Sequence, residues 1–174
     1  MAILPVIIAP DPRLKVRCQA VERIEDEVRR LMDDLLETLG AANGIGLAAP
    51  QVGVTRRVIA IDVHGADEDP NPLVLANPEI LSASDEEITN EEGCLSLPEY
   101  YAEVRRPAAI QVRYLDRDGE VRELAAEGLL AVCIQHEIDH LDGVLFVDHV
   151  SALKRNIILR KLSKMKRTAS EAAE

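Results

Sequence analysis

The chain has 174 residues, the size of one domain with one core, and 47% of them are hydrophobic, which is ample to fill that core. Its three cysteines are odd in number and widely spaced, which argues against a disulfide framework and for a reducing compartment. The net charge is −11, and no apolar run approaches the roughly 18 to 20 residues that cross a bilayer, so we expect a cytoplasmic protein without a membrane or DNA partner.

The first part of the chain predicts a strand, a helix and an irregular loop. Residues 1–10 are apolar, but no positively charged region precedes them, so we interpret them as a strand and not as a signal peptide. Residues 26–39 carry apolar side chains at the i, i+3, i+4 spacing of a helix that faces a core. Residues 43–53 contain three glycines and one proline, which favour a structured loop over a regular element.

The middle of the chain predicts strands that are separated by polar connections. The strands are rich in β-branched and apolar residues, and they are expected at residues 57–63, 73–81, 109–115 and 120–125. The last two flank the turn at residues 116–119 and should form a hairpin. Residues 65–72 and 82–90 are polar and are interpreted as exposed connections.

The last part of the chain predicts two helices of different character. Residues 128–141 are apolar nearly all round, which places that helix in the interior with strands packed about it. Residues 151–168 predict an amphipathic helix with seven basic residues and no acidic one, followed by a disordered tail at residues 169–174. Residues 1–150 hold 13 basic and 29 acidic residues, a net charge of −16, so an acidic body carries a basic helix.

The interior helix contains the segment His136-Glu137-Ile138-Asp139-His140. Positions i and i+4 share one helix face, so both imidazoles can bind one ion while Glu137 lies beside them as a base for the metal-bound water. Burial of two imidazoles and a carboxylate costs several kcal/mol unless each is compensated, and one divalent cation compensates all three. The segment therefore predicts a metal hydrolase.

These predictions combine into one α+β domain that spans residues 1–174. Its small set of mixed or antiparallel strands should surround a central metal-binding helix, with a helix before it and the amphipathic helix after it. The periodicities leave the strand order open.

A catalytic metal centre usually takes three protein ligands and leaves a fourth position for water, so a third ligand has to be found. His149 lies beyond the expected helix end, and a capping or surface role suits it better. In a metzincin-type extension the third histidine would fall at residue 146, which is Phe146, so that pattern fails.

The cysteines offer the remaining candidates for the third ligand. Cys94 lies between a glycine and an apolar segment and could be presented to the helix, although a buried structural cysteine is also common. Cys133 lies three residues before His136 and cannot readily complete a tetrahedron with the two histidines, so we expect it to line the pocket. Cys18 could in principle compete.

Three segments of the chain together resemble the peptide deformylase family. They occur in the family's order and at similar separations, and the resemblance extends through nearly the whole chain up to the C-terminal helix. The segments are Gly44-Ile45-Gly46-Leu47-Ala48-Ala49-Pro50-Gln51, Glu92-Gly93-Cys94-Leu95-Ser96 and Gln135-His136-Glu137-Ile138-Asp139-His140-Leu141-Asp142-Gly143. Asp142 departs from the asparagine of many members, and Tyr100-Tyr101 stand where other members show polar or basic residues.

The resemblance implies hydrolysis of the N-formyl group from the initiator methionine of new polypeptides, by attack of a metal-bound water. It assigns the metal ligands Cys94, His136 and His140, the acid/base Glu137, and the oxyanion donors Gln51 and the backbone N–H of Leu95. It implies one divalent ion per chain and favours Fe²⁺, while a thiolate and two imidazoles can also accept Zn²⁺, Ni²⁺ or Co²⁺.

Substrate-binding residues are expected on the glycine-rich loop and on the helix turns before the first histidine ligand. Together they could wall an apolar slot for a methionine side chain, although core packing explains Val132 equally well. These residues are Gly44, Ile45 and Gly46 on the loop and Leu129, Val132 and Cys133 on the helix. Asp139 is expected to have a structural role, paired with Arg106 or another cation.

The basic residues of 151–168 favour a polyanionic partner, and ribosomal RNA is the natural candidate because the resemblance places the substrate at a ribosome. Two alternative functions stay open at this point. A zinc endopeptidase of the HExxH type would use a carboxylate or histidine as its third ligand. A structural zinc module would close its site with four protein ligands.

Overall fold

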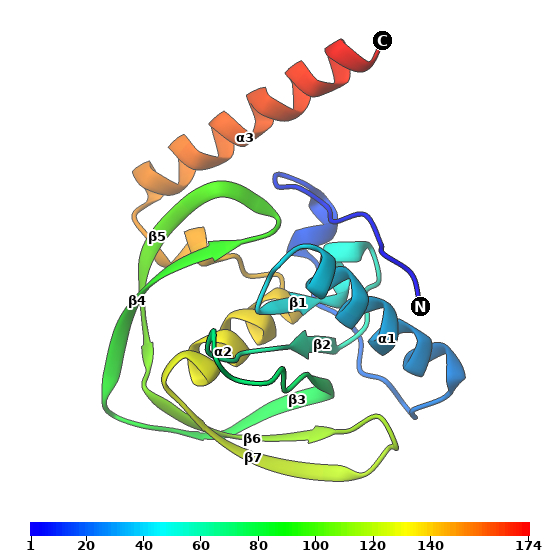
Figure 1. Cartoon of the computed structure of the whole chain (residues 1–174). Helices are drawn as coiled ribbons and strands as arrows, with labels where there is room; N and C mark the ends of the chain where they lie inside the picture. Colours follow the sequence, from blue (N-terminus) through cyan, green and yellow to red (C-terminus); the bar gives the residue numbers. More distant parts are fainter.

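The computed structural model describes residues 1–174, and Figure 1 shows how its elements are arranged. Five strands form one antiparallel sheet. From one edge of the sheet to the other they are β1 (Gly46–Ala48), β2 (Val58–Ile61), β3 (Leu73–Ala83), β6 (Ala109–Leu115) and β7 (Val121–Glu127). The short strand β1 is therefore an edge strand.

A second sheet consists of a long hairpin, β4 (Glu87–Cys94) and β5 (Leu97–Pro107). The antiparallel register shifts between Gly93 and Cys94, so that Cys94 pairs with Leu97 where the chain turns. Burial alternates along both strands, because successive side chains point to opposite faces. The core-facing positions include Glu92, Ala102, Val104 and Arg106, and the exposed positions include Glu91, Tyr101 and Glu103.

Three α-helices complete the fold. Helix α1 (Asp26–Ala41) packs on β1 and β2, and helix α2 (Gly128–Leu141) contacts β1, β2, β5, β6 and β7. Helix α3 (Ala152–Ala173) projects from the body in Figure 1 and ends far from the N-terminus. None of these helices combines the length and the apolar character that a membrane span requires.

The position of α2 follows from its sequence. Ten of its 14 residues are buried, because its apolar side chains cover nearly the whole circumference. They pack against β2, β3 and β6 in one core cluster, while α1 buries its stripe in a second. The molecule is therefore an α+β protein with antiparallel sheets, as predicted, and α2 lies among the strands.

Several predicted elements agree with the structure and several do not. The helices at residues 26–39 and 128–141 and the hairpin at 109–125 are confirmed, with small shifts in their bounds. Residues 1–10 were predicted to be a strand, which is wrong, because residues 1–8 pair with no strand. The expected loop at 43–53 contains β1 and a 3₁₀ turn, η2 (Ala49–Val52), because backbone pairing with β2 overrides its glycine content.

The largest error concerns residues 82–90, which were interpreted as a polar connection. Instead β3 continues to Ala83 and β4 begins at Glu87, because the polar residues occupy the solvent-facing positions of a long, half-exposed hairpin. At the C-terminus α3 continues to Ala173, beyond the expected helix end at residue 168.

Candidate active site

The side chains of Cys94, His136 and His140 lie together where the β4–β5 hairpin meets α2. One ligand atom of each residue lies within 4.8 Å of the other two, and Cys94 Sγ and His140 Nε2 are 3.4 Å apart. The histidines come from successive turns of α2, and their rings meet edge to face with centroids 5.0 Å apart. Cys94 reaches them because the register shift at the end of β4 turns the strand toward α2.

The donor set and the spacing of these atoms fit a divalent metal ion. Ligand atoms roughly 2.0 to 2.3 Å from a tetrahedral ion lie about 3.5 Å from one another. Burial lowers the pKa of His140 well below its usual value, which keeps this imidazole in the neutral form that binds metals. Burial also disfavours the charged form of His136, but hydrogen bonds with Cys94 and Glu92 raise its pKa well above the usual value. His136 thus occupies a position that favours positive charge.

Two buried polar atoms of this site, Glu137 Oε2 and His140 Nδ1, have no hydrogen-bond partner in the protein. Such an atom costs about 1 to 3 kcal/mol unless a ligand or water satisfies it. Glu137 is 4% exposed, and burial raises its pKa to about 7, which a cation beside it would lower again. A carboxylate in this state can accept a proton and return it near neutral pH.

Two buried charged residues, Glu92 and Arg106, form the hydrogen bonds that fix the ring of His136. The Nδ1–H of His136 donates to Glu92 Oε1 at 2.8 Å, and Arg106 donates to both oxygens of Glu92 at 2.6 and 2.9 Å. Burial raises the pKa of Glu92, but the hydrogen bonds from His136 and Arg106 outweigh it and lower the pKa to about 2. Because an ionised carboxylate can only accept, Nδ1 keeps its proton, and Nε2 is the nitrogen that faces the ligand cluster and would bind a metal in place of its own proton.

Arg106 also pairs with a second acidic residue, which belongs to α2. Arg106 Nη1 donates to Asp139 Oδ2 at 2.9 Å, which confirms the expected pairing of these two residues. The ring of His149 lies 2.8 Å from the same oxygen and stays partly exposed, in agreement with a surface role.

The amide of Gln51 is fixed in one orientation at the ligand cluster. The backbone N–H of Ala48 donates to Gln51 Oε1 at 2.9 Å, so the amide nitrogen points the other way. This nitrogen donates to Ser96 Oγ at 3.0 Å and lies 3.4 Å from Cys94 Sγ. Gln51 is 1% exposed, so its N–H donor is held in place beside the candidate ligands.

Strand β1 passes α2 at very short range. A Cβ atom on Gly46 would lie 2.6 Å from Glu137 Oε1 and 2.8 Å from Cys133 Sγ, so a larger residue would displace one of them. The Cys133 thiol donates to the carbonyl oxygen of Ile45 at 3.4 Å. Glycine at position 46 thus lets the edge of the sheet approach the carboxylate.

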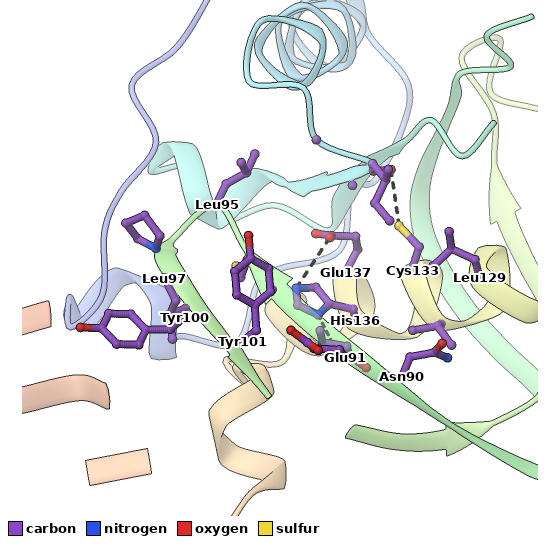
Figure 2. Close-up of a pocket in the computed structure, with 18 of the residues that line it drawn as sticks. Asn90, Glu91, Leu95, Leu97, Tyr100, Tyr101, Leu129, Cys133, His136 and Glu137 are labelled. Atoms are coloured by element: carbon purple, nitrogen blue, oxygen red, sulfur yellow. Dashed lines mark hydrogen bonds and ion pairs between the residues drawn. The ribbon is translucent and has the colours of Figure 1, made fainter. Parts of the chain in front are cut away.

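A cavity of about 490 Å³ opens beside these groups. In Figure 2, Leu129 and Cys133 lie on one side of His136 and Glu137, and Tyr100 and Tyr101 lie on the other. This volume suits a ligand of a few residues. The lining includes all the residues that were predicted to bind substrate, namely Gly44, Ile45, Gly46, Leu129, Val132 and Cys133, and also Leu95.

The structure also places Cys18 and Phe146, which the sequence analysis considered at the site. Cys18 packs in the core with β2 and β3, away from the ligand cluster, and Phe146 stacks on His136 at a centroid distance of 6.3 Å. The support that Glu92 and Arg106 give to His136 was missed. A signal existed, because Arg106 follows Ala102 and Val104 at the alternate, core-facing positions of one strand.

An α+β fold with a Cys/His/His cluster and a buried, unpartnered carboxylate at a peptide-sized cavity defines a hydrolytic enzyme. The family model described as polypeptide deformylase matches residues 3–156. The chain belongs to the peptide deformylase family of enzymes, whose reaction is the deformylation of new polypeptides.

Individual relatives agree with this assignment. The chain is 54% identical over 167 residues to a peptide deformylase of Agrobacterium fabrum, an alignment that covers 96% of this chain and 98% of the relative. A crystal structure of peptide deformylase from Ehrlichia chaffeensis superimposes with a TM-score of 0.92 at 39% identity and covers 97% of this chain and 99% of the other. A further structure of the Ehrlichia chaffeensis enzyme, in complex with actinonin, also has a TM-score of 0.92, at 40% identity, and covers 96% of this chain and 99% of that chain. These matches do not favour the alternative of a zinc endopeptidase.

Proposed function

We propose that this chain removes the formyl group from the N-terminal formyl-methionine of new polypeptides, with Glu137 as the acid/base of a metal-assisted hydrolysis. The observation that carries the proposal is the buried carboxylate of Glu137, which lines the cavity with Oε1 3.9 Å from His136 Nε2 and with Oε2 unpartnered in the protein. A buried carboxylate oxygen without a protein partner is suited to a water molecule or a substrate atom. Together with the family assignment, this arrangement favours hydrolysis at that point.

The thiolate of Cys94 and the Nε2 atoms of His136 and His140 would hold one divalent ion. When bound, the ion acts as a Lewis acid that makes water a stronger nucleophile at neutral pH and polarises the formyl carbonyl. Family membership favours Fe²⁺, and the same donors accept Zn²⁺, Ni²⁺ or Co²⁺. Glu92 supports this role because it fixes the tautomer and the orientation of His136.

The protein residues around this point have complementary tasks. Glu137 accepts the proton of the attacking water and later delivers it to the departing amine, so one carboxylate serves both steps. The formyl oxygen gains negative charge as its carbon becomes tetrahedral. Gln51 Nε2 and the backbone N–H of Leu95 are proposed as donors to this oxygen, and loss of one such donor costs roughly 3 to 4 kcal/mol in transition-state stabilisation.

The cavity next to this site suits a methionine side chain. Ile45, Leu129 and Val132 supply an apolar wall, and the Cys133 thiol, tied to the carbonyl of Ile45, supplies a polarisable one. Strand β1 is an edge strand, so its outer backbone groups can pair with an extended peptide. Replacement of Ile45 or Leu129 by a bulkier residue should raise KM for formyl-methionyl peptides, and unchanged kinetics would remove these residues from the pocket.

The proposal is tested by anaerobic hydrolysis of formyl-Met-Ala-Ser, because a thiolate–iron centre is oxidised in air. The wild type should release formate, and Glu137→Gln should reduce kcat roughly 10²- to 10⁴-fold while it keeps its metal. Cys94→Ala should lose the metal. A Cys94→Ala protein that retains both metal and activity, or an active Glu137→Gln protein, would overturn the assignment.

We further propose that α3 binds ribosomal RNA in the cytoplasm, where nascent chains emerge. Its basic side chains contrast with the acidic body, and most of them are exposed. Because Ile158 and Leu162 of α3 are part of the core, charge changes test this better than removal of the helix. Replacement of Arg160, Lys161, Lys164 and Arg167 by Gln should weaken binding to 70S ribosomes and lower its salt dependence. Equal binding of the wild type and the variant to ribosomes would contradict this proposal.

A further inference from the structure

His149 lies outside the ligand cluster, yet it is hydrogen-bonded to the residues that support one of the ligands. It is the last residue of a 3₁₀ turn, η3 (Phe146–His149), which follows α2 in the chain. Its Nε2 atom lies 2.8 Å from Asp139 Oδ2, and Arg106 Nη1 donates to that same oxygen at 2.9 Å. An ionised carboxylate only accepts hydrogen bonds, so His149 Nε2 is the second donor to Asp139.

Four hydrogen-bonded contacts connect His149 with His136. They join His149 to Asp139, Asp139 to Arg106, Arg106 to Glu92 and Glu92 to His136. The exposed fraction of the side chains falls along this path, from 36% in His149 and 25% in Asp139 to 6% in Arg106 and 5% in Glu92. The path therefore connects a surface side chain with a buried candidate metal ligand.

The guanidinium of Arg106 is shared between two carboxylates. Its Nε and Nη2 groups donate to Glu92, and its Nη1 group donates to Asp139. The donors of an arginine form a rigid, planar fork, so a shift of Asp139 would also shift the two donors that hold Glu92. Because Asp139 is partly exposed, its carboxylate can turn toward water unless a second donor holds it, and His149 is that donor.

The turn that carries His149 is itself fixed against the site. Phe146, three residues earlier in η3, stacks on the His136 ring at a centroid distance of 6.3 Å. At the same turn the backbone N–H of Leu145 donates to Asp148 Oδ2 at 2.9 Å, and Lys15 pairs with that oxygen. One short turn thus contacts His136 directly through Phe146 and indirectly through His149.

We propose that His149 is a positioning residue of the metal site, which holds Asp139 so that Arg106 and Glu92 keep the ring of His136 in its ligand orientation. The inference rests on the proposed function, which makes His136 a metal ligand. Loss of the group that hydrogen-bonds the second nitrogen of a ligating histidine typically costs roughly 10- to 100-fold in metal affinity. His149 acts further from the ligand, so its loss should cost less, roughly 3- to 10-fold.

The test is the affinity for Co²⁺, measured anaerobically by competition with a chelator. His149→Ala should bind Co²⁺ roughly 3- to 10-fold more weakly than the wild type, and the absorption bands of the bound ion should shift because they report its ligand geometry. His149→Gln should restore most of the affinity, since its amide nitrogen can donate to the same carboxylate. A His149→Ala protein with wild-type affinity overturns the proposal, as does a His149→Gln protein that binds as weakly as His149→Ala.

His64 provides a matched control. It forms the same kind of pair, with Nδ1 2.9 Å from Asp62 Oδ1, and the exposed fractions of the two side chains, 35% and 22%, are close to those of His149 and Asp139. Neither His64 nor Asp62 lines the cavity or belongs to the ligand cluster. His64→Ala should therefore leave the Co²⁺ affinity unchanged, and a loss as large as that of His149→Ala would contradict the inference.

A second background tests the route by which His149 acts. Members of one hydrogen-bond network have non-additive effects, so His149→Ala should change the Co²⁺ affinity of the Glu92→Gln protein by less than about 2-fold. A further loss in this background as large as that in the wild-type background would mean that His149 acts by a route other than Glu92, which overturns the inference.

Failure of the inference and failure of the proposed function give different results. A wild type that binds Co²⁺, together with a His149→Ala protein of equal affinity, would overturn the inference alone. A wild type that binds no divalent ion at Cys94, His136 and His140 would overturn the proposed function itself. Circular dichroism verifies that each variant is folded.

Discussion

Helices α2 and α3 are both regular and both carry charged or metal-binding groups, yet they are built in opposite ways. Ten of the 14 residues of α2 are buried, whereas α3 buries only Ile158 and Leu162 of its 22. On α2, His136 and Asp139 form hydrogen bonds with Glu92 and Arg106, whereas most basic side chains of α3 face solvent.

The difference indicates which property each helix requires. A catalytic cluster needs its atoms held to within a fraction of an ångström, and only a packed core with partnered polar groups provides that rigidity. A surface that binds a polyanion needs exposed charge and little else. Substitutions on α2 or its supports should therefore have large effects, and matched substitutions on α3 should have small ones outside its two core residues.

The largest effect is expected for Arg106→Met. This change leaves the buried carboxylate of Glu92 and the half-buried carboxylate of Asp139 without their arginine, which should lower the free energy of unfolding by about 3 to 5 kcal/mol. Urea denaturation measures it. Arg105→Met, on the next position of β5, breaks only an exposed pair with Glu87 and should cost less than about 1 kcal/mol. An equal loss of unfolding free energy in the two variants would show that the buried ion pairs of Arg106 contribute no more to stability than the exposed pair of Arg105.

A slightly smaller loss is expected where α3 meets the core. Leu162 is fully buried in a cluster that includes Leu97 and Phe146, so Leu162→Ala should lower the free energy of unfolding by about 2 to 4 kcal/mol. Leu153, another leucine of α3, is 73% exposed, so Leu153→Ala should change the free energy of unfolding by less than about 0.5 kcal/mol. Thermal or urea unfolding of the two variants side by side decides whether α3 is docked in solution.

The third prediction concerns the support of a ligand and not the ligand itself. Glu92→Gln keeps the volume of the side chain but removes the charge that fixes the tautomer of His136 and compensates Arg106. Metal affinity should fall roughly 10- to 100-fold. Competition with a chelator measures this affinity, and Glu91→Gln, the exposed neighbour on the same strand, serves as the control. An unchanged affinity in Glu92→Gln would mean that packing alone orients the ring.

The smallest effect is expected at the distal anchor of α3. Lys166 Nζ donates to the carbonyl oxygens of Ile8 and Pro10, both at 2.9 Å, and Lys166→Met should cost about 1 kcal/mol of local stability. Hydrogen exchange should become faster for the amides of residues 166–173. Lys164→Met is the control, because it removes a neighbouring exposed charge that forms no such bonds. Faster exchange in both variants would mean that the loss of positive charge, and not the loss of the hydrogen bonds of Lys166, destabilises the helix end.

The sequence predicted much of the fold because its signals were local. The apolar periodicity of residues 26–39 and the almost wholly apolar run of 128–141 have one simple outcome, a helix with a buried face. The β4 strand was missed because its polar, solvent-facing residues conceal the alternation, and β1 because its pairing with β2 is a long-range contact. The ribosome-facing role of α3 and the roles of the site residues stay predictions.

By itself the sequence determined that two histidines share one helix face and that a glutamate lies beside them, because residues four apart on a helix are separated by about one turn. Which distant groups meet that face was decided only by the tertiary structure. The register shift at Gly93 brings Cys94 to His140, and the missing side chain of Gly46 admits β1. The pairing of β4 with β5 brings Arg106 to Glu92, and the packing of β5 against α2 brings it to Asp139. These contacts join residues far apart in the chain, so no local pattern encodes them.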